Sequence, residues 1–151
     1  MRLLTLTFLI ASPLMAAPPA TSSPATSTGL EVRLAFLEPG PNLIRVDIPN
    51  QFGPVYMAPT PFLTAKYIKR VVSEPDDHGF PGMKLYFTRE GAAFVRRIST
   101  ANLGKHLVFL LAGKPVFAPR IEEPISSDVT RIDGFLTQTQ IDAFVSAVPA
   151  K

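Results

Sequence analysis

Residues 106–121 have the sequence HLVFLLAGKPVFAPRI, in which two apolar runs flank a short turn. Residues 106–111 and 115–121 are both rich in β-prone side chains. Between them lie Ala112, Gly113 and Lys114, and glycine can adopt the positive φ that a tight turn requires. The pattern predicts a β-hairpin, the clearest in the chain, and antiparallel sheet as the basis of the fold.

Further strands are predicted on both sides of this hairpin. In residues 30–36 apolar side chains alternate with Glu31, Arg33 and Ala35, as in a half-buried strand. Residues 76–82 are rich in turn formers and precede a strand at 83–87, so a hairpin with a long loop is expected there. Shorter extended segments are predicted at 44–48, 55–57 and 129–132.

Three helices are expected among these strands. Thr64 is a predicted N-cap, because Ile68, Val71 and Val72 follow it at helical spacing. Thr88 caps a second helix, which Gly104 is placed to end. Thr137 and Gln140 form a predicted capping box for a terminal helix with an apolar stripe. The order of elements predicts an α+β fold: a single small domain of antiparallel β-hairpins with about three helices packed on one face.

The N-terminal region has the pattern of an export signal. In residues 1–17 Arg2 precedes an uncharged apolar run that closes on Ala16 and Ala17. The run is shorter than the roughly 20 apolar residues of a membrane-spanning helix, so we expect a cleaved signal peptide and a periplasmic or secreted protein. Residues 18–29 contain only Ala, Pro, Thr, Ser and Gly and predict a flexible tether. Residues 30–151 are then the folded domain.

Composition excludes several kinds of site. The chain has no cysteine, which excludes disulfides, thiolate chemistry and lipid attachment through a thiol. The formal net charge of +3 includes Arg2, and the basic residues are scattered, so nucleic-acid binding is not expected. The nucleophile elbow, the phosphate-binding loops and the zinc-protease helix motif do not occur in the sequence. We therefore expect no cofactor and no catalytic residues.

Few side chains remain as candidates for chemistry. Asp76, Asp77 and His78 could be imagined around a metal, but in a Gly/Pro-rich turn such residues are ordinarily solvated. A small hydrolase would need carboxylates that folding brings together, and Asp128 and Asp133 are the candidates for that alternative.

Phe117 is the candidate for a binding surface. Aromatic residues in strands belong to the core more often than to ligand platforms. An exposed aromatic near a strand edge would, however, suit the addition of an extended peptide to the sheet. The predicted contact region is the hairpin surface formed by Gly113, Lys114, Pro115, Phe117 and Pro119.

A series of turn and cap residues resembles the head subdomain of the first periplasmic domain of SecD, a protein translocase subunit, and of its fused form SecDF. The similarity extends from about Leu30 to Val148. The structural turn and cap positions that it covers are Thr64, Thr88, Gly91, Gly104, Gly134 and Thr137. The segments that carry it are Val55-Tyr56-Met57, Pro61-Phe62-Leu63-Thr64, Phe87-Thr88-Arg89-Glu90-Gly91-Ala92-Ala93-Phe94, Asn102-Leu103-Gly104-Lys105, Gly113-Lys114-Pro115-Val116, Ala118-Pro119, Pro124-Ile125, and Ile132 with Gly134.

The resemblance implies a function as well as a fold. SecD carries transmembrane helices that couple the proton motive force to export, whereas we expect this chain to be a free-standing, non-catalytic binding domain. It would contact extended or exported polypeptide, or an envelope partner protein. A structural or inhibitory partner of one envelope protein is the other non-enzymatic alternative. The chain departs from the family pattern at Ala112, Phe117, Ser126-Ser127 and Leu136.

Overall fold

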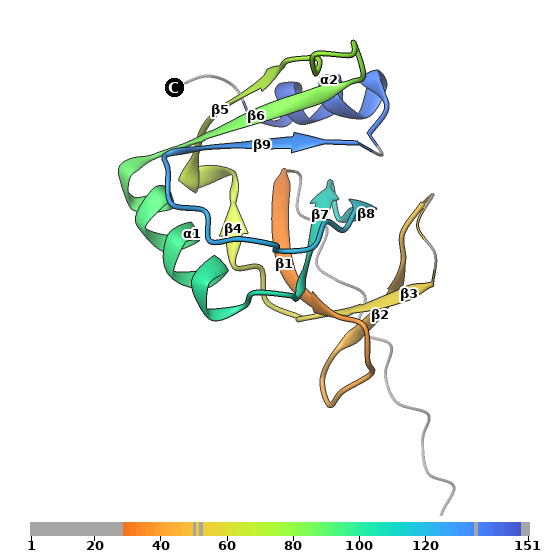
Figure 1. Ribbon diagram of the computed structural model, residues 1–151. Helices are drawn as coiled ribbons and strands as arrows, with labels where there is room; N and C mark the ends of the chain where they lie inside the picture. The colour runs from red at the N-terminus through yellow and green to blue at the C-terminus, as the bar shows by residue number, and fades with distance from the viewer. Residues whose placement is uncertain (1–28, 50, 52, 135, 149–151) are drawn as a thin grey trace, which may run out of the picture.

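The computed structural model describes residues 29–49, 51, 53–134 and 136–148 (Figure 1). The predicted signal peptide and all of the predicted tether except Gly29 lie outside the described residues. The described residues form two antiparallel β-sheets and two α-helices, which confirms the α+β class. None of their helices is both long and apolar enough to cross a membrane.

The larger sheet is built around β1 (Leu30–Phe36). Its strand order is β2-β3-β1-β7-β8, and β4 also pairs with β1. The predicted hairpin forms its β7–β8 half, but β8 ends at Phe117 and only an isolated bridge between His106 and Arg120 continues the pairing. On the other side of β1, β3 pairs with Ala35 and Phe36 and β4 pairs with Glu31 and Val32, so the two short strands share one edge. The remaining bounds are β2 (Ile44–Asp47), β3 (Pro54–Met57), β4 (Leu63–Thr64), β7 (His106–Leu111) and β8 (Lys114–Phe117).

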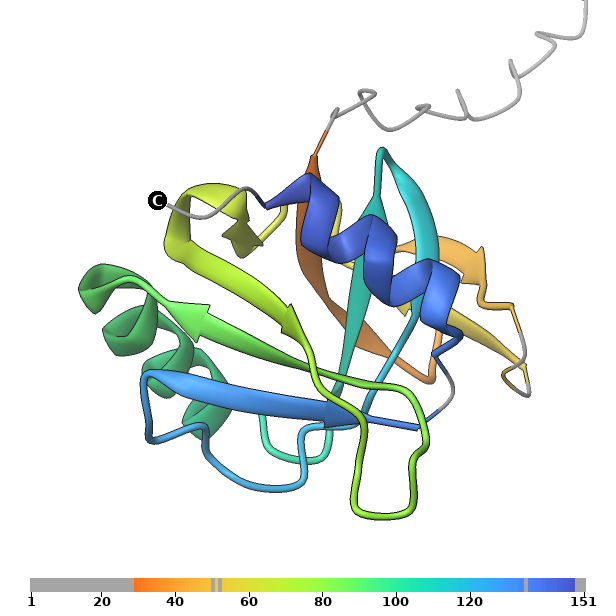
Figure 2. The same cartoon turned by 90° about the horizontal axis from the view of Figure 1, so that it is seen from above.

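The smaller sheet has the order β5-β6-β9. Its strands are β5 (Ile68–Ser73), β6 (Gly82–Phe87) and β9 (Val129–Asp133). The first two form the predicted hairpin with a long loop, which spans residues 74–81. Helix α1 (Arg89–Ala101) follows β6 directly, and α2 (Gln138–Ala147) lies along β5 (Figure 2). Strand β9 forms one edge of this sheet, because β6 is its only partner strand among the described residues.

One core holds the two sheets together. Both helices contribute to it, through Val95 of α1 and Ile141 and Phe144 of α2, on the side of the smaller sheet that also carries Leu85. The prediction that helices pack on one face is therefore confirmed. The other face of this sheet carries polar residues such as Lys84 and Arg131.

Strand β1 is buried on both faces, which corrects the prediction of a half-buried strand. Ala35 belongs to a second apolar cluster with Val108 and Leu110, on the face opposite the main core. On the same face Arg33 is only 5% exposed. Its guanidinium pairs with Glu31 at 2.8 Å and donates to the Pro59 carbonyl, so a buried charge has partners.

The predicted first helix is wrong. Thr64 has extended backbone and makes no side-chain cap bond, and a single 3-10 turn, η1 (Ala65–Tyr67), follows it. Ile68, Val71 and Val72 lie in β5. The register of β5 against β6 shifts between Ile68 and Arg70. This bulge adds a residue, so the buried Ile68 and Val71 are three apart, a spacing that imitates a helix.

The other two helices begin as predicted. The Thr88 hydroxyl accepts from Gly91 N at 3.0 Å, and Thr137 forms a capping box with Gln140. Gly91 also meets a steric requirement, because a Cβ there would lie 2.2 Å from the Tyr67 carbonyl oxygen. The predicted turn positions Gly104 and Gly134 have φ values of 81° and 76°.

Candidate functional site

The hairpin predicted as a contact surface has a strained turn. Gly113 has a φ of 76°, as expected, and Ala112 before it has a φ of 48°, in the left-handed region that alanine rarely adopts. Lys114 is exposed, while Gly113 and Pro115 are partly buried. Proline has no N–H, so Pro115 weakens the β8 edge as a template for another strand.

Phe117 lies in the core. Its side chain is 4% exposed and stacks on Phe109, with ring centroids 4.5 Å apart. Phe144 of α2 meets it edge-on at 5.8 Å. The backbone groups of the next residue, Ala118, are also hydrogen-bonded: its N–H donates to the Gln51 side chain, and its carbonyl accepts from it. Phe117 therefore has no exposed ring to offer a ligand, and its core interpretation holds.

A cleft lies elsewhere, between the two sheets. Its volume is about 470 Å³. Of the five predicted contact residues, only Pro119 lines it. Residues 119–127, which lead from β8 toward β9, form one wall, and Val129, Thr130, Arg131 and Ile132 of β9 form another. The apolar floor consists of Val32, Phe62, Leu63, Leu85, Phe87, Val95, Leu107 and Phe109.

Hydrogen bonds hold the 119–127 wall in place. Ile121 is buried, and its N–H and carbonyl bond to the Lys105 carbonyl and the Gly104 N–H, both at 2.8 Å. Farther along, the Ile125 N–H donates to the buried Ser99 hydroxyl of α1 at 2.9 Å. Between these two anchors Glu122 and Glu123 are exposed. The wall is thus tied down at both ends and presents two carboxylates at its middle.

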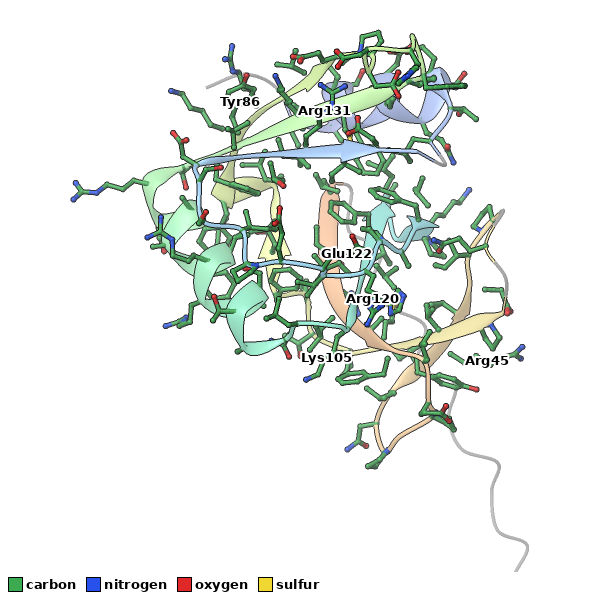
Figure 3. All side chains as sticks on the ribbon, in the orientation of Figure 1. Arg45, Tyr86, Lys105, Arg120, Glu122 and Arg131 are labelled. Atoms are coloured by element: carbon green, nitrogen blue, oxygen red, sulfur yellow. The ribbon has the colours of Figure 1, made fainter. Side chains whose placement is uncertain are left out.

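The outer face of the smaller sheet, away from the apolar floor, carries charges that are paired with one another. Arg131 of β9 contacts Asp133 at 2.7 Å and Glu74 at 3.2 Å, and Lys84 contacts Glu74 at 2.6 Å. The hydrogen bond from Lys84 lowers the pKa of Glu74, and the hydrogen bond to Asp133 raises the pKa of Arg131. Glu122 and Glu123, in contrast, form no ion pair with any residue that the structure describes. Figure 3 shows Arg131 on β9 and Glu122 on the facing segment.

Comparison with known families identifies relatives of this chain. Residues 42–146 match the family described as "SecDF, P1 head subdomain". The chain belongs to this family. The match extends from just before β2 into α2. It confirms the resemblance to the SecDF head.

Individual relatives support the assignment. The chain is 35% identical over 72 residues to the protein translocase subunit SecD of Acidaminococcus fermentans, covering 48% of this chain and 17% of that protein. It is 29% identical over 116 residues to SecDF of Thermus thermophilus, covering 73% of this chain and 15% of that protein. The chain thus spans less than a fifth of the length of these relatives.

Solved structures share the fold of this head domain. One is described as "Crystal structure of SecDF in Super-membrane-facing form"; its TM-score is 0.60 at 21% identity, covering 80% of this chain and 18% of that one. Another is described as "Structure and function of a membrane component SecDF that enhances protein export". Its TM-score is 0.60 at 20% identity, covering 90% of this chain and 70% of that one.

The carboxylates proposed for a hydrolase do not meet in this head domain. Asp128 directly precedes β9 and Asp133 is its last residue, so they are five residues apart, which corresponds to about 17 Å along a strand. The Asp133 carboxylate is bonded to Arg131. The predicted pair is therefore not formed.

The turn at 76–80 is organised by its own hydrogen bonds. Asp76 Oδ1 accepts from the N–H groups of His78 and Phe80, at 2.9 and 2.8 Å. Within the described part of the chain no cluster of three His, Asp or Glu side chains could hold a metal ion.

The sequence did not predict the cleft of the head domain. Its walls come from residues 119–127 and from β9, which are distant in the chain from β1 and β6 but adjacent to them in space. A signal was available in Glu122, Glu123 and Pro124, which follow the β-prone run 115–121 and interrupt the strand pattern, because such a stretch often runs over the surface at a binding site.

Proposed function

We propose that this chain is a non-catalytic periplasmic binding domain that holds extended or exported polypeptide in the cleft between its two sheets. The observation that carries the proposal is the apolar floor of the cleft beside an edge strand. Apolar pockets with a few polar groups at the rim are the usual form of ligand sites. An edge strand at the rim adds backbone groups that can bind any sequence.

Two further observations support the proposal. The chain belongs to the SecDF head family, and a related solved structure is described as a membrane component that enhances protein export. The cleft replaces the hairpin surface as the proposed contact region, because Phe117 is buried and Pro115 lies on the β8 edge. The periplasmic location rests on the signal peptide predicted in residues 1–17.

Filling the cleft tests the proposal. Thr130 lines the cleft and is only partly buried, so Thr130→Phe should occupy the space without disturbing the floor. Binding of a fluorescent unfolded peptide, followed by anisotropy, should weaken by about tenfold, which corresponds to ~1.4 kcal/mol. Thr139→Phe, on the exposed first turn of α2, is the matched control and should bind as the unchanged protein does.

Each outcome has a clear meaning. Loss of binding in Thr130→Phe alone supports the cleft. Equal binding by all three proteins would place any polypeptide site elsewhere, and absence of binding by the unchanged protein would contradict the proposed function itself.

A further inference from the structure

Strand β9 has a free side, and its hydrogen-bonding pattern shows which backbone groups face it. Phe87 N donates to the Asp128 carbonyl at 2.8 Å, and the register pairs Tyr86 with Val129. Inward and outward groups alternate along an antiparallel strand. The N–H and carbonyl groups of Thr130 and Ile132 therefore face β6, while those of Val129, Arg131 and Asp133 face the open edge.

The outward backbone groups of Val129 already have a hydrogen-bond partner. The Ser127 hydroxyl donates to the Val129 carbonyl and accepts from Val129 N at 3.4 Å. Among the described residues no such partner is present at the backbone groups of Arg131 and Asp133. Ser127 thus occupies the outward backbone groups at one end of β9. The outward groups of Arg131 and Asp133 are left to pair with an added strand, and they fix its register.

The cleft borders this same edge. Four consecutive residues, 129–132, line it. Since neighbouring side chains of a strand point to opposite faces, a cavity that touches all four lies against the edge of β9 and not only against one of its faces. A chain that lay along the edge would therefore place every second side chain in the cleft.

The 119–127 wall adds a preference for a positively charged ligand. Glu122 and Glu123 are exposed and have no cationic partner in the described part of the chain. A basic side chain on a bound segment could pair with either of them, at the rim of the apolar floor. Opposite charges across an interface fix the register of a bound partner more than they raise its affinity.

From these observations we infer that an extended polypeptide segment binds by strand addition, pairing with Arg131 and Asp133 as a fourth strand of the β5-β6-β9 sheet. Alternate apolar side chains of the segment enter the cleft, and a Lys or Arg lies against Glu122 or Glu123. This inference rests on the proposed polypeptide-binding function and specifies its mode and its sequence preference.

A second copy of the chain is the competing occupant. Two β9 edges could pair Arg131 of one copy with Asp133 of the other. Such a two-fold pairing would, however, bring the unpaired Glu122 and Glu123 of both copies to the same junction, whereas a basic segment neutralises them. Charge complementarity therefore favours the foreign segment.

Amide hydrogen exchange tests the inference on the full chain. The probe is a short peptide in which valine alternates with lysine. On saturation with this peptide, exchange at Arg131 and Asp133 should slow by about tenfold or more, because both amides gain an acceptor. Exchange at Thr130 and Ile132, whose amides already face β6, should change much less.

Two variants of Arg131 separate the contribution of its backbone N–H to binding from that of its side chain. Arg131→Pro removes the outward N–H at a position where an edge strand tolerates proline, and it should weaken peptide binding by about tenfold. Arg131→Ala loses the side chain but keeps the N–H, so it should bind the peptide more tightly than Arg131→Pro does. Peptides methylated at single backbone nitrogens give a test that leaves the protein intact, and every second methyl group should block binding.

The outcomes distinguish this inference from the proposed function. Peptide binding without slower exchange at Arg131 and Asp133, and without sensitivity to N-methylation, overturns strand addition and leaves polypeptide binding standing. No binding by the unchanged protein overturns both. Slower exchange at the two amides that depends on protein concentration and needs no peptide identifies a second copy as the occupant and overturns the inference.

Discussion

The ring of Phe117 stacks on the ring of Phe109 with centroids 4.5 Å apart and planes inclined by 19°. Phe117 comes from β8 and Phe109 from β7, and Phe144 of α2 closes the group from a third side. These three rings join the hairpin to the terminal helix. The residue predicted to be the best candidate for an exposed contact is instead part of the packing between elements.

Truncation of Phe117 is expected to destabilise the fold strongly. Phe117→Ala removes a buried ring and leaves a cavity, so the free energy of unfolding should fall by about 3–5 kcal/mol in urea denaturation. Phe80, which is 65% exposed, is the matched control, and Phe80→Ala should lie within about 0.5 kcal/mol of the unchanged protein. Similar effects at the two positions would contradict the burial of Phe117.

Local signals in the sequence identified most of the elements. The alternation in 30–36, the turn at Gly113 and the caps at Thr88 and Thr137 are each set by a few neighbouring residues. They were predicted because the backbone geometry at these positions depends on side chains close in the chain. The same holds for the α+β class, which follows from the order of the elements.

Features that depend on distant contacts were missed or wrong. The bulge in β5 gives Ile68 and Val71 a helix-like spacing, and only the pairing with β6 reveals it. The burial of Arg33 depends on the carbonyl of Pro59, 26 residues away. The cleft depends on the position of the 119–127 segment against β9, which no periodicity in either segment encodes.

Ser99 is expected to hold the wall of the cleft. Its hydroxyl is buried, donates to the Arg96 carbonyl at 3.1 Å and accepts from Ile125 N at 2.9 Å. Ser99→Ala leaves the Ile125 N–H without this acceptor, which should reduce the free energy of unfolding by about 1–3 kcal/mol. Amide exchange at Ile125 should become faster.

Ser146 offers a control for this prediction. It also lies in a helix and donates to a backbone carbonyl, that of Asp142 at 2.8 Å, but it is exposed. Ser146→Ala should change stability by no more than about 0.5 kcal/mol. An unchanged exchange rate at Ile125 in Ser99→Ala would show that the wall is held in some other way.

Ala112 is expected to be a site where glycine stabilises the protein. Its φ of 48° is unfavourable for alanine by roughly 1–2 kcal/mol. Ala112→Gly removes this strain but adds freedom to the unfolded chain, so we expect a net gain of about 1 kcal/mol in chemical denaturation. Ala143→Gly, on the exposed face of α2, should instead lower stability by about 1 kcal/mol. A loss of stability at both positions would contradict the left-handed turn.

His106 is expected to make stability depend on pH near neutrality. Burial, with a smaller effect of the Arg120 charge, lowers its pKa in the folded protein below the reference value of 6.5. Above pH 6.5 the imidazole is neutral in both states and adds no pH dependence. As the pH falls through 6.5 the unfolded chain takes up a proton before the folded one does, so stability declines until the folded-state pKa is passed. The thermal midpoint should therefore be lower at pH 5.5 than at pH 7.5.

Replacement of His106 isolates this effect. His106→Gln should remove the decline between pH 7.5 and 5.5, whereas His78→Gln, in the exposed loop after β5, should retain it. Glu74 acts in a separate range: its lowered pKa contributes stability that is lost only as the pH falls below the reference value of 4.5. A decline of equal size in His106→Gln and in the unchanged protein would assign the pH dependence near neutrality to another group.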